Sequence, residues 1–136
     1  MTDCVLDASA VVLATSGRGG DAGALRERLP SMRRHAPHLV DAEVGNVLRR
    51  HERAGLISRG EAEAALWSLP VLVQHRYRHV GPLAELAWSL RDNLTFYDAL
   101  YAALAIRLGA PLLTCDSRLS RAPLDCEIEV VSSARR

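Results

Sequence analysis

The stretch CVLDAS, residues 4–9, is a short apolar run that ends at Asp7. A second run of the same kind, APLLTCD at residues 110–116, ends at Asp116. Unbroken apolar runs, as opposed to alternating ones, are typical of strands in a parallel sheet that is covered on both faces. We therefore expect two buried, parallel strands, each of which ends at an aspartate.

The rest of the chain alternates between strand-like and helical segments, with helices in the majority. Ser58 and Glu61 have the spacing of a helix capping box, and Gly109 follows a long helical segment. Residues 71–80, VLVQHRYRHV, have no clean period and could form a short strand or a loop. The other expected elements are helices at 9–16, 22–29, 41–55, 58–70, 82–93 and 94–109, strands at 35–40 and 126–132, the last at a sheet edge, a loop at 16–21 and a helical turn at 116–122. This pattern predicts an α/β fold in which residues 1–136 form one domain, a three-layer α/β/α sandwich with a central, mainly parallel sheet.

The composition excludes several classes of protein. Hydrophobic residues make up 49% of the 136 residues, which argues against disorder. All 17 basic residues are arginine, so any mechanism that requires a lysine is excluded. Three cysteines without metal-ligand spacing favour reduced, buried thiols in the cytoplasm. The N-terminal stretch lacks a basic region and no apolar run approaches 18 residues, so we expect neither a signal peptide nor a membrane partner.

Four carboxylates are candidates for a common site. Asp7 and Asp116 end the two buried strands, while Glu43 and Asp98 lie in the first turns of expected helices. Ligands of open α/β sheets bind just outside the carboxyl ends of the strands. Each acid also has a purely structural explanation: Asp7, Asp41 and Asp116 could cap the helices that follow them, and Thr95 and Asp98 have capping spacing. If the helices begin at the same sheet edge, the four carboxylates converge.

Such a cluster of acids needs compensation. Four carboxylates in a cleft repel one another unless some keep their protons or a cation neutralises them. A site made only of oxygen ligands suits Mg²⁺ or Mn²⁺, which also bind phosphate groups. Because the formal net charge is +1, the chain without these four acids carries +5. A negative pocket within a positive surface indicates a metal-dependent nuclease.

Four motifs in this order, VLDASAVV (5–12), LVDAEVGNVLRR (39–50), LTFYDALYAALA (94–105) and PLLTCDSRL (111–119), resemble the PIN domain, and in particular its VapC toxin branch. The resemblance covers residues 4 to 131. It implies a divalent-metal-dependent endoribonuclease that is the toxic half of a type II toxin–antitoxin pair, with Asp7, Glu43, Asp98 and Asp116 as its acidic quartet and Mg²⁺ or Mn²⁺ as its cofactor. Ser9, Thr114 and Ser117 match the positions that supply hydroxyl groups to the site.

The resemblance also implies partners. RNA would be the substrate, and a VapB-like antitoxin would lay its C-terminal segment along a groove between the helices that start near Ser9, Asp41 and Ser58. A homodimer is expected as well. Residues that could line this groove, or instead belong to the core, are Leu56, Ile57, Leu66, Trp67 and Leu69. Arginines that could contact RNA phosphates, or simply form a solvated face, are Arg49, Arg50, Arg53, Arg118 and Arg121.

Three other interpretations compete with this one. A phosphoacceptor receiver domain and a phosphatase of the haloacid dehalogenase type both require a lysine, which this sequence does not contain. A non-catalytic PIN-like module that binds RNA or a protein stays open, although the presence of all four acids argues against it.

Overall fold

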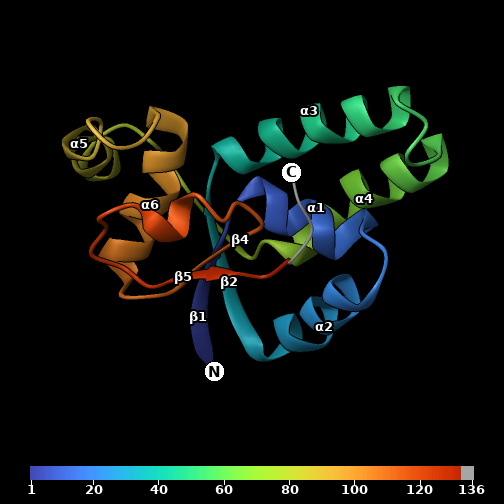
Figure 1. The fold of residues 1–136 in the computed structure, drawn as a ribbon, viewed down its shortest axis with the longest axis horizontal. Coiled ribbons are helices and arrows are strands. Elements are labelled where there is room, and N and C mark those ends of the chain that lie inside the picture. The colour runs from blue at the N-terminus through green and yellow to red at the C-terminus, as the bar shows by residue number, and fades with distance from the viewer. Residues whose placement is uncertain (133–136) are drawn as a thin grey trace.

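The computed structural model describes residues 1–132 and is built around one parallel sheet. Its strands are β1 (Thr2–Leu6), β2 (Met32–Pro37), β3 (His75–Tyr77), β4 (Leu112–Thr114) and β5 (Ile128–Val130). Their order is β3-β2-β1-β4-β5 and every neighbouring pair is parallel, as expected (Figure 1). The ambiguous segment at 71–80 contains a strand, β3, and the final strand lies at an edge as predicted.

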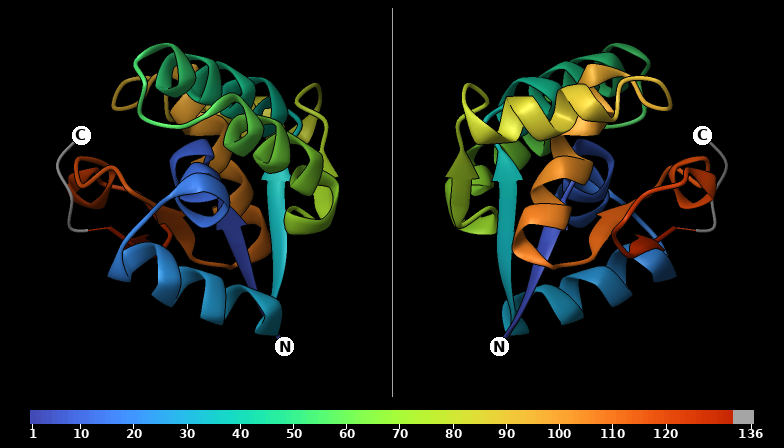
Figure 2. Two further views of the ribbon diagram at one scale, coloured as in Figure 1. Left: turned by 90° about the vertical axis from the view of Figure 1, so that its right-hand side faces the viewer. Right: turned by 90° about the vertical axis from the view of Figure 1, so that its left-hand side faces the viewer.

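Helices cover both faces of the sheet, which confirms the three-layer sandwich (Figure 2). The helices α1 (Ala8–Ser16), α2 (Gly20–Arg28), α3 (Leu39–Arg53) and α4 (Arg59–Leu72) pack together on one side, and α5 (Pro82–Ser89) and α6 (Phe96–Leu108) lie on the other. Two short 3₁₀ turns, η1 (Leu29–Ser31) and η2 (Leu119–Arg121), connect elements. The sheet is therefore buried on both faces, which explains why β1 and β4 have unbroken apolar sequences.

The strand order places a topological switch point between β1 and β4. From β1 the chain first builds the sheet outward through β2 and β3, and then returns to the other side of β1 to add β4 and β5. Leu6 lies opposite Leu113 in the ladder, so Asp7 and Thr114 follow side by side at the carboxyl ends of their strands. Ligands of open α/β sheets bind at this position.

The predicted boundaries of β2 and α3 were partly wrong. We expected a strand at 35–40 and a helix from residue 41, whereas the strand spans Met32–Pro37 and the helix begins at Leu39. The polar start of β2 is accommodated because Arg33 forms an ion pair with Asp3 on the neighbouring strand. Asp41 does not cap its helix, since His38 is at the N-cap; its carboxylate instead accepts two hydrogen bonds from Arg76.

The predicted end of α4 at Pro70 was also wrong, because the helix continues to Leu72. A proline within a helix removes one backbone hydrogen bond and usually ends the helix. Here Arg34 lies beneath the last turn and donates to the carbonyl oxygens of Leu72 (2.6 Å) and Val71 (3.4 Å). These hydrogen bonds satisfy carbonyl groups at the helix C-terminus, where a positive charge is also favoured.

Arg34→Met is expected to lower the free energy of unfolding by about 3 kcal/mol, which corresponds to a fall in melting temperature of about 10 °C. Arg34 is buried, and its guanidinium also donates to the carbonyls of Leu29 and Met32, so the substitution leaves several carbonyl groups without a partner. Thermal unfolding followed by circular dichroism measures the effect. The matched control is Arg33→Met, which removes only a partly exposed ion pair worth at most about 1 kcal/mol. Equal losses for the two variants would contradict this account.

The helix α6 lies directly against the sheet. Ala102 and Ala105 are fully buried, and their small side chains allow the helix to contact β1, β2 and β4. The helix ends at Gly109, whose φ of 62° is a left-handed conformation that glycine adopts without strain. The thiols of Cys4 and Cys115 are buried, as expected. None of the helices in the described part of the chain is both long and apolar enough to cross a bilayer.

Candidate functional site

Asp7 is held rigidly at the switch point of the sheet. It ends β1 and caps α1, so the structural explanation considered for it is correct as far as the cap goes. Its Oδ1 accepts hydrogen bonds from Ser9 Oγ (2.6 Å) and from the backbone N–H of Ala10 (3.0 Å). Its Oδ2 accepts one from Thr114 Oγ1. Only 8% of Asp7 is exposed, so these groups fix the position of a nearly buried carboxyl group.

The two hydroxyl groups beside Asp7 connect it to the loop after β4. Ser9 Oγ accepts a hydrogen bond from the backbone N–H of Cys115 (2.8 Å), and Thr114 Oγ1 accepts one from the N–H of Asp116 (3.0 Å). Each hydroxyl therefore donates to Asp7 and accepts from the loop that carries Asp116. This arrangement fixes the start of α1 relative to that loop, and it confirms that Ser9 and Thr114 lie with the acidic residues.

Asp98 lies in the first turn of α6, where Thr95 caps the helix by accepting a hydrogen bond from the Asp98 backbone N–H (3.2 Å). Partial burial raises the pKa of Asp98, and the charge of Asp116 raises it further. A hydrogen bond with Thr95 and the charge of Arg118 act in the opposite direction. The position at a helix N-terminus also favours the carboxylate form. Capping and a role in the site are thus compatible for this residue.

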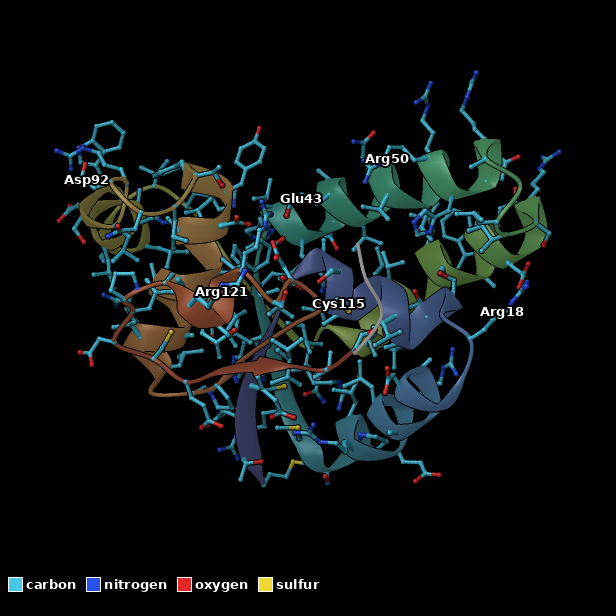
Figure 3. All side chains as sticks on the ribbon, in the orientation of Figure 1. Arg18, Glu43, Arg50, Asp92, Cys115 and Arg121 are labelled. Carbon is cyan, nitrogen blue, oxygen red and sulfur yellow. The ribbon has the colours of Figure 1, made fainter. Side chains whose placement is uncertain are left out.

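Glu43 comes from α3, near the beginnings of α1 and α6 (Figure 3). Because α3 begins at Leu39, Glu43 lies in the second turn of the helix and not in the first turn, where we expected it. Its Oε1 accepts a hydrogen bond from Tyr101 Oη (2.6 Å), and Tyr101 is a buried residue of α6. Burial raises the pKa of Glu43, the hydrogen bond from Tyr101 lowers it, and the charge of Asp98 raises it again. The charge of Asp98, on a different helix, therefore acts on Glu43.

Asp116 follows β4 and is the most exposed of the three aspartates. Its carboxylate accepts hydrogen bonds from the Arg118 backbone N–H (2.9 Å), from Nε (3.0 Å) and from Nη2 (2.7 Å). These hydrogen bonds from Arg118 hold the pKa of Asp116 below its usual value. The backbone contact shows that Asp116 does support the turn that leads to η2, as one of the structural explanations proposed.

Burial raises the pKa of Asp7 to about 6, although the hydrogen bonds from Ser9, Thr114 and Ala10 lower it; the charge of Asp98 raises it further. Asp98 therefore acts electrostatically on both Asp7 and Glu43, and Asp116 acts on Asp98. Within residues 1–132, however, no three acidic, histidine or cysteine side chains are close enough to hold a metal ion as they stand. The four acids are neighbours that repel one another, but their carboxylates do not converge on one position that a metal ion could occupy.

The donor set fits a hard divalent cation. All four acids offer carboxylate oxygens, and the hydroxyl groups of Ser9 and Thr114 lie beside Asp7. Mg²⁺ and Mn²⁺ prefer such oxygen ligands. A cation here would offset the repulsion and draw the partly exposed carboxylates of Glu43, Asp98 and Asp116 towards Asp7.

A groove of about 740 Å³ runs beside the acids between α1 and α3. Ser9, Cys115 and Asp116 line it next to the acids, and Arg50 and Arg118 are also in its wall. Of the five residues expected in a partner groove, Leu56 and Ile57 line this one. The other three do not: Leu69 is buried, Leu66 packs against the core, and Trp67 is exposed on α4.

All five arginines that could contact RNA are exposed, but they are not all at the groove. They are Arg49, Arg50, Arg53, Arg118 and Arg121. Besides Arg50 and Arg118 in its wall, Arg121 is near enough to lower the pKa of Asp116. Arg49 and Arg53 are on α3 but are not among the groove residues.

Comparisons with known proteins agree with this geometry. The family model of the PIN domain matches residues 4–124. "Ribonuclease VapC1" of Mycobacterium tuberculosis is 54% identical over 132 residues, which are 96% of this chain and 99% of that protein. The chain belongs to the PIN domain family, in its VapC branch.

Solved structures share the PIN fold. VapBC2 from Rickettsia felis, bound to a DNA fragment from their promoter, has a TM-score of 0.69 at 15% identity, over 94% of this chain and 98% of that chain. VapBC-5 from Mycobacterium tuberculosis, a member of the VapBC family of toxin-antitoxin systems, has a TM-score of 0.61 at 19% identity, over 95% of this chain and 97% of that chain. At these identities the two structures support the fold alone.

One residue of the site, Tyr101, was not predicted from the sequence. One predicted residue, Ser117, forms no hydrogen bond with the acids in the part of the chain that the structure describes. Tyr101 was missed, although its spacing of three residues from Asp98 places both on one face of a helix. Ser117 is exposed, and among the described residues no hydrogen bond joins its hydroxyl to the acids; only its backbone carbonyl accepts, from Ser120. Its role in the site stays a prediction.

Proposed function

We propose that this chain is the toxin of a type II toxin–antitoxin system, a divalent-metal-dependent endoribonuclease formed by a single PIN domain of residues 1–136. One observation supports this most strongly: the four acids, two at the ends of β1 and β4 and two in the N-terminal parts of α3 and α6, lie at the switch point of the sheet. There Asp98 acts electrostatically on Asp7 and Glu43, and Asp116 acts on Asp98. The name of its 54% identical relative, a ribonuclease, supports the same activity.

The residues of the chain have separate tasks in this proposal. Bound Mg²⁺ or Mn²⁺ would lower the pKa of a water molecule and neutralise negative charge at the scissile phosphate. Asp7, Asp98 and Asp116 would hold the cation, and the hydrogen bonds from Ser9, Ala10 and Thr114 keep Asp7 in one orientation.

Glu43 has a different environment, which suits a different task. Tyr101 fixes one of its oxygens by a hydrogen bond of 2.6 Å, and the other oxygen stays available to orient water or to complete the ligand set. Burial raises the pKa of Glu43, which makes its carboxylate a better proton acceptor than an exposed one.

RNA would reach the acids along the groove between α1 and α3. Arg50 and Arg118 in the groove wall, with Arg121 close by, can contact phosphate oxygens on either side of the scissile bond. Arg49 and Arg53 would extend this positive surface along the exposed side of α3. The surplus of +5 outside the acidic quartet would attract the RNA backbone.

A VapB-like antitoxin is the proposed protein partner. Membership in the VapC branch supports it, and the apolar side chains of Leu56 and Ile57 give the groove a surface that a peptide segment can cover. Binding there would also block the acids. Membership in this branch further suggests a homodimer, which sedimentation velocity of the purified chain would test.

The alternative is a PIN-like module that binds RNA or protein without cutting. The buried Asp7 disfavours it, because a purely structural cap at this position would not need a carboxyl group whose pKa is raised to about 6 by burial. An uncharged cap such as serine would avoid this cost.

Cleavage of end-labelled RNA by the purified chain should require millimolar Mg²⁺ or Mn²⁺, stop in EDTA and resume when the metal is restored. The same ions should raise the melting temperature by about 10 °C at a hundredfold excess over the dissociation constant, because they relieve the repulsion among the acids. Differential scanning fluorimetry provides this second measurement. Cleavage that persists in EDTA would contradict metal dependence, and metal binding without cleavage of any RNA would favour the non-catalytic module.

A further inference from the structure

Arg118 makes more contacts with the acidic site than any other basic residue in the described chain. Its Nε lies 3.0 Å from Asp116 Oδ1 and 3.2 Å from Oδ2, and its Nη2 lies 2.7 Å from Oδ2. The guanidinium therefore covers both oxygens of a carboxylate that the proposed function assigns to the cation. A cation and this guanidinium compete for the same two atoms.

The ion pair between Arg118 and Asp116 is weak enough for a cation to replace the guanidinium. The side chain of Arg118 is 79% exposed and that of Asp116 is 29% exposed, and exposed pairs of this kind contribute at most about 1 kcal/mol. A divalent cation with several carboxylate ligands can displace such a guanidinium. The backbone N–H of Arg118 also bonds to Asp116 Oδ1, so the main chain stays beside the site when the side chain leaves.

The released guanidinium would remain close to the reacting groups. Arg118 is in the wall of the groove that leads to the acids, together with Arg50 and Asp116. It is also near enough to Asp98 to act on that carboxylate electrostatically. A planar guanidinium at this distance suits a phosphate oxygen, which it can bind through two parallel hydrogen bonds.

We propose that Arg118 is a resident counter-ion of the carboxylate site, which neutralises Asp116 until a divalent cation displaces it and then binds a phosphate of the RNA. This inference rests on the proposed function and adds an exchange step to it. It makes Arg118 a residue with two opposite effects: the side chain weakens metal binding and strengthens RNA binding.

Arg118→Met tests the two effects together. Mn²⁺ affinity, measured by isothermal titration calorimetry without RNA, should increase about fivefold, because the competitor is gone. The KM for RNA in saturating Mn²⁺ should rise, and its dependence on salt should weaken by about one charge. A residue that only supported the fold would not change the two affinities in opposite directions. The melting temperature in EDTA should stay near that of the wild type, since the side chain is exposed.

Arg121→Met is the matched control, because Arg121 acts on Asp116 through its charge alone and makes no hydrogen bond with that carboxylate in residues 1–132. It should change Mn²⁺ affinity less than about twofold, the effect of removing one nearby exposed charge. Equal gains in the two variants would overturn the counter-ion role. So would an unchanged KM for RNA in Arg118→Met. If the wild type bound no Mn²⁺ at all, the proposed function itself would fail.

Discussion

Asp98→Asn should lower the rate of RNA cleavage by at least about 100-fold. Residues that only support metal ligands cost 10- to 100-fold when they are substituted, and the loss of a ligand is expected to exceed that. Asp98 is the acid whose charge acts on both Asp7 and Glu43. Initial rates on labelled RNA in saturating Mg²⁺ measure the effect.

The substitution should leave the fold intact. The helix cap depends on Thr95 and on the backbone N–H of residue 98, which asparagine keeps. The loss of a partly buried charge also removes repulsion from Asp116, so the melting temperature in EDTA should stay level or rise. The control is Asp92→Asn, an exposed residue in the turn after α5 and well away from Glu43 (Figure 3), which should retain full activity. Wild-type cleavage by Asp98→Asn would refute the assignment of the active site.

The features that sequence could predict are those determined by local pattern. The unbroken runs before Asp7 and Asp116 indicate buried parallel strands, and the edge position of the last strand follows from its alternating sequence. Thr95 and Ser58 predict their own helix starts, because a cap is a contact between residues three apart. Once these elements are joined in one sheet, the carboxyl ends meet at one edge and the acids are neighbours.

The features that sequence could not predict depend on partners far along the chain. The last turn of the helix α4 continues beyond Pro70 because Arg34, on the strand β2, donates hydrogen bonds to its carbonyl groups. Similarly, β2 can carry an arginine at its second position because Arg33 has Asp3 beside it. The partner of Glu43, Tyr101, is 58 residues away, and a tyrosine in an apolar helix is easily taken for a core residue. In each case a polar group is satisfied across elements, which no local pattern shows.

Asp7→Asn should make the protein more stable in EDTA at pH 8, although it abolishes metal-dependent cleavage. Burial raises the pKa of Asp7 from 3.8 to about 6. Between about pH 4 and pH 6 the folded protein therefore holds a proton on this group that the unfolded chain has already lost. The stability that Asp7 contributes is therefore present below about pH 4 and disappears as the pH rises through 6. Above pH 7 the buried charge costs about 3 kcal/mol, which asparagine avoids.

The sign of the effect reverses when metal is added. The cation needs the ionised form of Asp7, so Mg²⁺ should stabilise the wild type at pH 8, should do so less below pH 6, and should hardly stabilise Asp7→Asn at all. Melting temperatures at pH 4, 6 and 8, with EDTA or with Mg²⁺, measure both effects, and Asp92→Asn should follow the wild type throughout. The gain in EDTA will fall short of 3 kcal/mol if the asparagine amide forms weaker hydrogen bonds with the hydroxyls of Ser9 and Thr114 than the carboxylate does.

A variant that is less stable than the wild type in EDTA at pH 8 would show that Asp7 is primarily a structural cap. An undiminished response to Mg²⁺ would place the cation elsewhere. The combination of higher stability and lost metal response is expected only if the carboxylate is retained for its chemistry, at the expense of the fold.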